Sequence, residues 1–236
     1  MVRKGKIIVI DGADGTGKAT TTQLVLMLLQ QRKPLGQAKV LTESFPNYRE
    51  FHGRQVRAYL SGDEAEAAVW VPPEIRADPY CASLPYAADR YRTYINRMQP
   101  QLSLGNWYLL DRYSSSNMAH MGAKLTSVPE RNRFIKRLGY LENSYFQLPK
   151  PDLVLILNLP EEIRVRRTEK RRDSTRAPAD DHEQNLSYMA KVAQEYRRLA
   201  DKFGWTIVEG VEDGRELTKE EMADRIFQRV VCYLGL

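Results

Sequence analysis

The segment Gly12-Ala13-Asp14-Gly15-Thr16-Gly17-Lys18 constrains the fold of this chain more than any other feature. It follows residues 6–11, an apolar run of strand length, and precedes residues 20–29, which are apolar enough for a helix packed on a sheet. Strand, Gly-x4-Gly-Lys and helix in this order form a phosphate-binding loop, or P-loop. Its glycines let backbone N–H groups face phosphates, and the helix N-terminus adds partial positive charge. We therefore expect Lys18 to reach the β- and γ-phosphates of a nucleotide.

The residue after the lysine departs from this pattern. Ser or Thr normally stands there, and its hydroxyl ligates Mg²⁺, but this chain has Ala19. Thr20 lies roughly 100° further around the helix and cannot simply replace that hydroxyl. We expect phosphates, water and carboxylates elsewhere to hold Mg²⁺, which commonly keeps several waters and takes one or two protein carboxylates.

The composition fits one soluble domain with polyanionic ligands. The 236 residues are 42% hydrophobic, enough for a substantial core in a single domain over residues 1–236. The net charge of +6 suits nucleotides as well as nucleic acids, and much of the basic excess lies between Arg164 and Arg176. Two cysteines without metal or disulfide spacing favour a reduced, cytoplasmic setting. We expect no signal peptide and no membrane span, because no apolar run reaches about 18 residues.

Short apolar runs alternate with helical segments along the chain. Strands are expected at residues 6–11, 38–42, 106–111, 153–157 and 206–208. Helices are expected after the P-loop and at about 49–60, 63–69, 79–104, 114 onward, 128–145, 160–170, 181–202 and 217–234. This alternation predicts an α/β fold of the P-loop NTPase type, with three α/β/α layers around a five-stranded parallel sheet. Ligands gather at the carboxyl ends of such strands, which places the P-loop, Phe45, Asp111 and the segment after Pro160 on one rim.

Asp111-Arg112-Tyr113 follows the third expected strand. A carboxylate opposite a P-loop is where enzymes of this kind hold Mg²⁺, directly or through water. The neighbouring Arg112 could bind a second phosphate with two parallel hydrogen bonds. The alternative is an ion pair between neighbours at the strand end.

Tyr86 and Arg90 lie four residues apart in the expected helix 79–104, so they share one face. An aromatic ring and a guanidinium together suit a nucleobase, because the ring stacks and the arginine donates to a carbonyl. The alternative is a core aromatic residue beside an exposed arginine.

A basic run precedes a polar break in the last third of the chain. The loop expected at 173–179, which contains Pro178, could close over phosphates and neutralise charge during phosphoryl transfer. The alternatives are a solvated charge run and a nucleic-acid patch, and the few interleaved aromatics weaken the second. His52, His120 and His182 have no partner at zinc-ligand spacing. The run comprises Arg164, Arg166, Arg167, Lys170, Arg171, Arg172 and Arg176.

In their order and spacing these segments resemble the thymidylate (dTMP) kinase family, from the first strand to about Phe203. The matching pieces are Asp-Gly-x-Asp-Gly-Thr-Gly-Lys, Phe45-Pro46, Tyr86-x3-Arg90, Asp111-Arg112-Tyr113-x2-Ser116 with Gly122-Ala123-Lys124, and Asp180-x-His182-Glu183.

The resemblance implies roles for individual residues around the acceptor nucleotide. Asp14 would contact the sugar 3′-hydroxyl of dTMP and, with Asp111, lie near Mg²⁺. Arg112 would hold the dTMP phosphate. Around the base, Phe45 would flank thymidine, Tyr86 would stack on thymine, Arg90 would donate to its O4, and Ser116 would lie beside it. His120 stands near the place where relatives often carry a tyrosine that excludes a ribose 2′-hydroxyl.

The resemblance also implies how the phosphoryl donor is bound. Lys18 would bridge the donor and acceptor phosphates, and Arg166, with the adjacent Arg167 as the alternative, would lie against the adenine of ATP. The family places a catalytic arginine either in the P-loop or in a short lid, and Gly15 indicates the lid type here. The arginine-rich lid would span about residues 168–182, with Arg171, Arg172 or Arg176 supplying the charge. ATP would be held by Gly12, Asp14, Gly15, Thr16, Gly17, Lys18, Ala19, Thr20 and Arg166.

We therefore expect a cytoplasmic, homodimeric enzyme that transfers the γ-phosphoryl group of ATP to dTMP with Mg²⁺, with no nucleic-acid or membrane partner. One alternative is a kinase for another monophosphate, such as dUMP or a ribonucleotide. Others are a P-loop protein that binds nucleic acid through its basic lid, and a nucleotide-binding regulator that lost catalysis along with the hydroxyl at residue 19.

Overall fold

The central sheet contains the five parallel strands that the sequence predicts. The computed structural model describes residues 5–32, 34, 36–60, 78–175 and 186–235. Its strands lie in the order β2-β3-β1-β4-β5, and neighbouring strands are parallel. Their bounds are β1 (Ile7–Gly12), β2 (Val40–Ser44), β3 (Trp107–Asp111), β4 (Leu153–Asn158) and β5 (Thr206–Glu209). The predicted fold class is confirmed.

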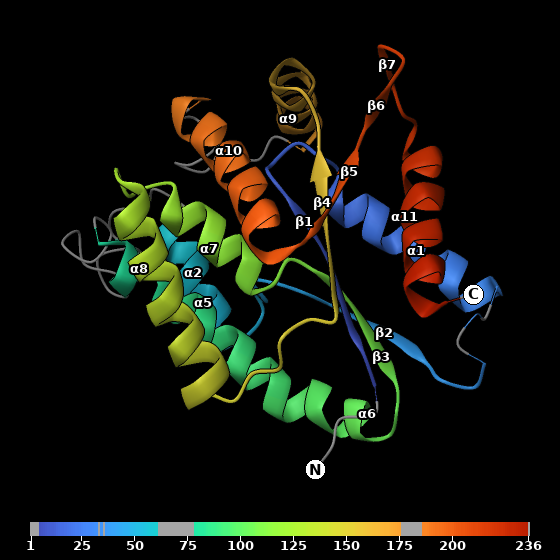
Figure 1. Ribbon diagram of the computed structural model, residues 1–236, viewed down its shortest axis with the longest axis horizontal. Coiled ribbons are helices and arrows are strands. Elements are labelled where there is room, and N and C mark those ends of the chain that lie inside the picture. Colours follow the sequence, from blue (N-terminus) through green and yellow to red (C-terminus); the bar gives the residue numbers. More distant parts are fainter. Residues whose placement is uncertain (1–4, 33, 35, 61–77, 176–185, 236) are drawn as a thin grey trace.

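Helices cover both faces of this sheet (Figure 1). Side chains alternate along β1, so that Ile7 and Val9 join one hydrophobic cluster while Ile8 and Ile10 join the other. Because both faces are buried, the strand reads in the sequence as a continuous apolar run. The Ile8 side is covered by α1 (Lys18–Arg32) and α11 (Lys219–Leu234). The opposite side is covered by α5 (Pro79–Thr93), α7 (Ser114–Gly122), α8 (Val128–Gly139) and α10 (Leu186–Phe203).

The helical segment after residue 78 has the predicted extent. The Asp78 side chain caps α5 by accepting from the backbone N–H groups of Tyr80 and Cys81. A π-helical segment, η1 (Tyr94–Met98), and α6 (Gln99–Ser103) continue this helix, and η2 (Tyr140–Tyr145) continues α8 in the same way. Helix α2 (Phe51–Leu60) begins slightly later than expected, and the helix predicted at 63–69 lies outside the described residues.

The predicted end of the basic helix is wrong. Helix α9 spans Glu161–Thr175, whereas the sequence pattern predicted its end near residue 170 and a loop from about residue 173. Residues 170–175 contain neither glycine nor proline, so no local signal ends the helix there. Residues 176–185, with the rest of the predicted loop, lie outside the described residues.

A hairpin after β5 is missing from the predicted elements. It pairs β6 (Val211–Glu212) with β7 (Arg215–Glu216) in antiparallel fashion. Its turn residues, Asp213 and Gly214, both have positive φ, as a two-residue hairpin turn often requires. The Asp-Gly pair was an available signal, but strands of two residues are too short to show an apolar pattern.

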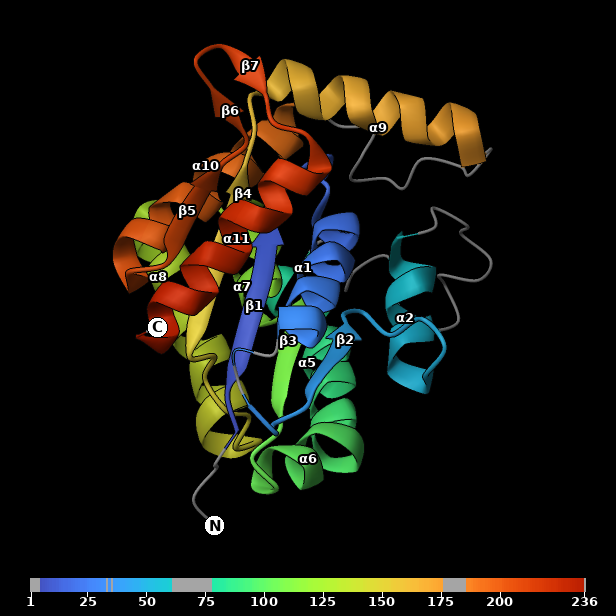
Figure 2. The ribbon, with the colours of Figure 1, turned by 90° about the vertical axis from the view of Figure 1, so that its right-hand side faces the viewer.

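One end of the molecule gathers the elements that the sequence assigns to ligand binding. Strands β1 and β4 point toward it, and α9 and the β6–β7 hairpin lie across it in both views (Figures 1 and 2). The strand order reverses beside β1, which is where open parallel sheets bind ligands. Among the described residues, no helix is long and apolar enough to cross a membrane.

Candidate active site

The P-loop folds around the amino group of Lys18, the first residue of α1. Lys18 Nζ donates to the carbonyl oxygen of Ala13 at 2.9 Å, and Thr16 Oγ1 donates to the same oxygen at 2.8 Å. Burial, helped by the nearby Arg112 cation, lowers the pKa of Lys18. A phosphate anion would compensate the positive charge that burial disfavours. The geometry of the loop therefore suits a bound phosphate.

Gly15 allows the P-loop to lie directly against α9. Its φ is +83°, and a Cβ atom there would lie 2.4 Å from the backbone oxygen of Arg164. A side chain at this position would displace the loop or the helix. The packing explains why residue 15 is a glycine, and the lid-type assignment stays a prediction.

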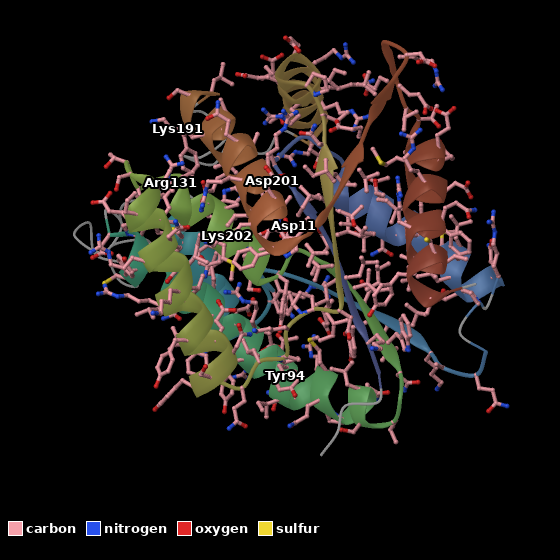
Figure 3. The ribbon with its side chains drawn as sticks, viewed as in Figure 1. Asp11, Tyr94, Arg131, Lys191, Asp201 and Lys202 are labelled. Atoms are coloured by element: carbon pink, nitrogen blue, oxygen red, sulfur yellow. The ribbon has the colours of Figure 1, made fainter. Side chains whose placement is uncertain are left out.

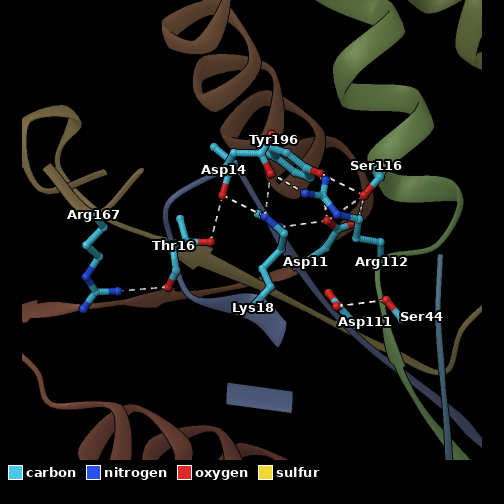
Figure 4. A network of polar contacts seen from close by, with 12 residues as sticks. Asp11, Asp14, Thr16, Lys18, Ser44, Asp111, Arg112, Ser116, Arg167 and Tyr196 are labelled. Atoms are coloured by element: carbon cyan, nitrogen blue, oxygen red, sulfur yellow. Dashed lines mark hydrogen bonds and ion pairs between the residues drawn. The ribbon is translucent and has the colours of Figure 1, made fainter. Parts of the chain in front are cut away.

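Asp14 holds two cations together at the centre of the site (Figure 4). Its Oδ1 atom lies 3.2 Å from Lys18 Nζ and also accepts a hydrogen bond from Arg112 Nη2. Burial alone would raise the pKa of Asp14, but the Arg112 and Lys18 charges hold it well below its usual value. Burial alone would lower the pKa of Arg112, but Asp14 together with Tyr196, Asp11 and Asp111 holds it well above its usual value. Asp14 is thus an anion across the physiological pH range.

Asp111 has a carboxylate oxygen suited to Mg²⁺. Its Oδ2 accepts a hydrogen bond from Ser44 at 3.1 Å, while Oδ1 is buried and has no hydrogen-bond partner among the described residues. Asp111 lines a cavity together with Lys18, Ala19 and Arg112, which we call the phosphate cavity. No group of three or more metal-binding side chains occurs in the described part of the chain. The donors present fit Mg²⁺ held by one carboxylate, substrate phosphates and water.

Asp11, the residue before Gly12, organises a buried network that the sequence did not reveal. Its carboxylate accepts hydrogen bonds from Ser115 at 2.5 Å, from Ser116 at 2.8 Å and from the Tyr196 hydroxyl at 2.8 Å. Asp11 belongs to β1 and is labelled in Figure 3, and its hydrogen bond from Tyr196 links β1 to α10. The Ser116 hydroxyl also accepts a hydrogen bond from Tyr196 at 3.1 Å. The hydroxyl of Ser116 is therefore engaged in this buried network.

A second cavity, which we call the acceptor cavity, adjoins the phosphate cavity. It brings together the predicted residues Asp14, Phe45, Tyr86, Arg90, Arg112, Ser116 and His120, and also Arg171. Phe45 precedes a cis peptide bond to Pro46, and its ring lies 5.8 Å from that of Tyr113. His120 packs edge-on against Tyr196 at 6.2 Å. Residues predicted from distant motifs therefore share one cavity.

Arg90 has a structural partner that the sequence did not indicate. Both residues of the Arg90–Glu142 pair are almost completely buried, with side-chain exposures of 2% and 1%. Arg90 Nε donates to Glu142 Oε2 at 3.1 Å, and Nη2 donates to Oε1. Arg90 also lines the acceptor cavity. Because Nε and Nη2 bind Glu142, Nη1 is the guanidinium nitrogen that could donate to a base. Its predicted contact with a base stays a prediction.

Two further polar residues of the acceptor cavity were missed. Asn117 donates from Nδ2 to the carbonyl oxygen of Ser83, and its buried Oδ1 has no partner among the described residues. Asp89 accepts from the backbone N–H of Asn47 at 2.8 Å, which ties the loop after Phe45 to α5. Asn117 lies one helical turn before His120, and this spacing was the available signal.

The arginines of α9 differ in whether they line the phosphate and acceptor cavities. Arg167 lines the phosphate cavity and its Nη1 atom donates to the carbonyl oxygen of Thr16 at 3.3 Å. Arg166 is 66% exposed and pairs with Glu216. Arg171 lines both the phosphate and the acceptor cavity. The side chain of Arg172, and all of Arg176, lie outside the described part of the structure.

Comparison with known proteins agrees with this geometry. The family model for thymidylate kinase matches residues 10–222. The chain belongs to the thymidylate kinase family.

Relatives of this family member match nearly their whole length. The probable thymidylate kinase 1 of Saccharolobus solfataricus is 29% identical over 224 residues, which cover 95% of this chain and 97% of that protein. The thymidylate kinase of Limosilactobacillus fermentum is 31% identical over 204 residues, covering 86% of each chain. The solved structure of thymidylate kinase from Candida albicans matches this chain with a TM-score of 0.68 at 22% identity. The match covers 95% of the Candida albicans chain and shows the same fold.

In this thymidylate kinase family member, Ala19 replaces the residue whose hydroxyl would ligate Mg²⁺, and it still lines the phosphate cavity. Ala19 and Thr20 are both exposed, and both line the phosphate cavity beside Asp111. Thr20 also lines a third cavity, bounded by Arg167, Leu217 and Met222, which we call the side cavity. That a carboxylate elsewhere serves Mg²⁺ stays a prediction, and Asp111 Oδ1, which has no hydrogen-bond partner among the described residues, is the candidate oxygen.

Proposed function

We propose that the protein transfers the γ-phosphoryl group of ATP to dTMP, giving ADP and dTDP. One observation carries this proposal: the phosphate cavity and the acceptor cavity share Asp14, Arg112 and Arg171. Two nucleotides bound on either side of these residues would bring their phosphates together over the P-loop. Direct transfer requires such an arrangement, because catalysis consists of positioning and charge neutralisation with no covalent intermediate.

The polar groups of the acceptor cavity support a thymine or uracil base. Asn117 Oδ1 can accept the N3–H of such a base, and Arg90 Nη1 can donate to its O4. Cytosine presents an acceptor at N3 and a donor at C4, so both contacts would be mismatched. Tyr86 supplies an aromatic face in the same cavity.

Charge stabilisation during transfer would come from three cations. Lys18 would contact the donor phosphates, Arg112 the acceptor phosphate, and Arg171 the group in transit. An arginine that stabilises the charge of the transferring phosphoryl group increases the rate about 10³–10⁵-fold in related phosphoryl transfers. Asp111 would hold Mg²⁺, which neutralises phosphate charge when bound. Arg172 and Arg176 of the proposed lid at about 168–182 remain alternatives to Arg171.

The adenosine of the donor would occupy the side cavity. The amino-terminal end of α1, Arg167 and the apolar side chains of Leu217 and Met222 form its walls. An apolar wall beside a guanidinium suits a purine, which stacks and accepts hydrogen bonds at its ring nitrogens.

ADP formation from ATP and Mg²⁺ tests the proposal when dTMP, dUMP, dCMP, dGMP, UMP and the ribo-analogue of dTMP are offered in turn. We expect a clear preference for dTMP over dCMP. A preference for the ribo-analogue would show that His120 does not exclude a 2′-hydroxyl. Absence of turnover with every acceptor would contradict the proposal and favour a nucleotide-binding regulator.

We also propose a homodimer, supported by exposed apolar residues on the α5–η1 segment. Leu84, Tyr91 and Ile95 are exposed and spaced seven and four residues apart, so they fall on one face. Tyr91 stacks on Phe146 at 4.9 Å, and Tyr145 beside it is 72% exposed. Sedimentation equilibrium, with Tyr91→Glu as the variant, tests this assignment. The cytoplasmic setting stays a prediction.

A further inference from the structure

We propose that Glu216 is a positioning residue that holds Arg167 against the P-loop for binding of the donor nucleotide. This inference rests on the proposed function, because it assigns a role within ATP binding. It gives a purpose to the β6–β7 hairpin, which carries Glu216 and which no nucleotide-binding motif of the sequence includes.

Glu216 and the P-loop hold opposite sides of the Arg167 guanidinium. Arg167 Nε and Nη2 lie 2.7 and 2.6 Å from Glu216 Oε1. The remaining nitrogen, Nη1, donates to the carbonyl oxygen of Thr16 at 3.3 Å. Glu216 Oε2 accepts from Arg166, so the carboxylate binds both arginines with separate oxygens. The Arg167 side chain, which has many rotamers when free, is thereby confined to one position.

That position lies where donor phosphates are expected. Arg167 lines both the phosphate cavity and the side cavity, so it stands at the junction between them. A Cβ atom on Gly17 would lie 3.3 Å from Arg167 Nη1, which places the cation directly over the loop. A guanidinium held here contributes positive charge to the same face as the loop N–H groups and Lys18.

The hairpin is well anchored as a support for Glu216. The backbone N–H of Gly210 donates to the carbonyl oxygen of Asn158 at the end of β4, and that of Leu217 donates to Gly210 at 2.9 Å. A side chain on Gly210 would collide with Leu159 and Met222. The chain on both sides of the hairpin is therefore tied to the sheet and to α11, so Glu216 offers a fixed carboxylate rather than a mobile one.

The opposite role is a latch, in which Glu216 competes with phosphate for Arg167. The two roles predict opposite effects of removing the charge. Glu216→Gln keeps the shape of the side chain but weakens the ion pair. If Glu216 positions Arg167, this variant binds ATP more weakly; if Glu216 is a latch, it binds ATP more tightly.

The matched control is Glu212→Gln in the same hairpin. Glu212 pairs with Arg225 of α11 at 2.7 Å and lines neither the phosphate cavity nor the side cavity. We expect Glu216→Gln to raise both the dissociation constant and the KM for ATP about tenfold, as the loss of a charge-assisted hydrogen bond implies. The KM for dTMP should change less than about twofold, and Glu212→Gln should behave as the wild type.

A double-mutant cycle separates positioning from a general structural effect. Arg167→Ala should weaken ATP binding by itself, and adding Glu216→Gln to it should cause little further loss because Glu216 acts through Arg167. Additive losses would overturn the inference, as would equal behaviour of Glu216→Gln and Glu212→Gln, or tighter ATP binding by Glu216→Gln. Calorimetric ATP binding needs no turnover, so a wild type that binds ATP but phosphorylates no acceptor would refute the proposed function alone. A wild type that binds no ATP would refute both.

Discussion

Arg112 and Lys18 share a single oxygen atom, Oδ1 of Asp14. The residue expected to bind the acceptor phosphate is thus joined, through Asp14, to the residue expected to bind the donor phosphate. The two positive charges repel each other, and the Arg112 cation therefore helps burial to lower the pKa of Lys18. Asp14 is the group that keeps the two cations together, so its charge should matter for stability as well as for binding.

Asp14→Asn should therefore destabilise the protein in a pH-dependent way. Because the pKa of Asp14 is lower in the folded state than its ordinary value of 3.8, the carboxylate contributes stability above that value. This contribution is lost as the pH falls through the folded-state pKa. We expect the variant to be about 1–3 kcal/mol less stable than the wild type at pH 7, and the gap to narrow as the pH falls below 3.8. Urea unfolding of both proteins across this range measures it. A constant gap would contradict the assignment, and the exposed Asp213→Asn serves as the control.

Lys18→Ala should nearly abolish turnover, because the amino group is the buried cation of the P-loop. We expect the fold to survive, because Thr16 Oγ1 still donates to the Ala13 carbonyl oxygen and the glycines of the loop are unchanged. Initial rates of ADP formation at saturating ATP and dTMP measure the loss. Lys39→Ala, an exposed lysine just before β2, should retain full activity. If Lys18→Ala kept more than about a tenth of the rate, the role of the loop in transfer would be wrong.

The elements that the sequence predicts best are those whose signal is local. The P-loop, β1 and β4 have continuous apolar runs or fixed glycine spacing, and each appears where expected. The predicted end of α9 was wrong because the sequence near residue 170 contains no stop signal, so a local pattern does not reveal where the helix ends. The β6–β7 hairpin was missed because each of its strands has only two residues.

The candidate site was predictable as a set of residues but not as a set of contacts. Asp14, Tyr86, Arg112 and His120 come from separate motifs, and the topology brings them to one cavity. Pairings such as Arg90 with Glu142 depend on side chains far apart in the chain. No local pattern reveals them, since they are decided by packing between helices.

The Arg90–Glu142 pair makes the substitution of Arg90 ambiguous unless stability is measured too. Arg90→Ala leaves the buried Glu142 carboxylate unpaired, which should cost about 3–5 kcal/mol of unfolding free energy. A double variant, Arg90→Met with Glu142→Leu, removes both charges and should recover most of this loss. If Arg90 also contacts the base, the double variant should still show a raised KM for dTMP and a normal KM for ATP. A normal KM for dTMP in the double variant would make Arg90 purely structural.

Asn117→Leu tests the base contact without disturbing an ion pair. The substitution removes the acceptor for N3–H and the hydrogen bond to the backbone oxygen of Ser83. We expect the KM for dTMP to rise about tenfold, as the loss of one or two hydrogen bonds implies, with the KM for ATP unchanged. Asn117→Asp retains an acceptor and should bind dTMP better than Asn117→Leu. Equal KM values for the two variants would exclude Asn117 as the base acceptor.

Asp111→Asn should raise the Mg²⁺ concentration needed for half-maximal activity about tenfold, a typical loss for a residue that orients metal-bound water. The amide keeps the size of the side chain but not the negative charge of Oδ1, the oxygen with no partner among the described residues. Ser44→Ala is the matched control, because it removes the contact to Oδ2 and leaves Oδ1 in place. Rates measured against Mg²⁺ at fixed ATP and dTMP should converge for Asp111→Asn and the wild type at high Mg²⁺. Parallel losses at every Mg²⁺ concentration would instead make Asp111 a support for Ser44 and the β2–β3 edge, with the metal held by phosphates and water alone.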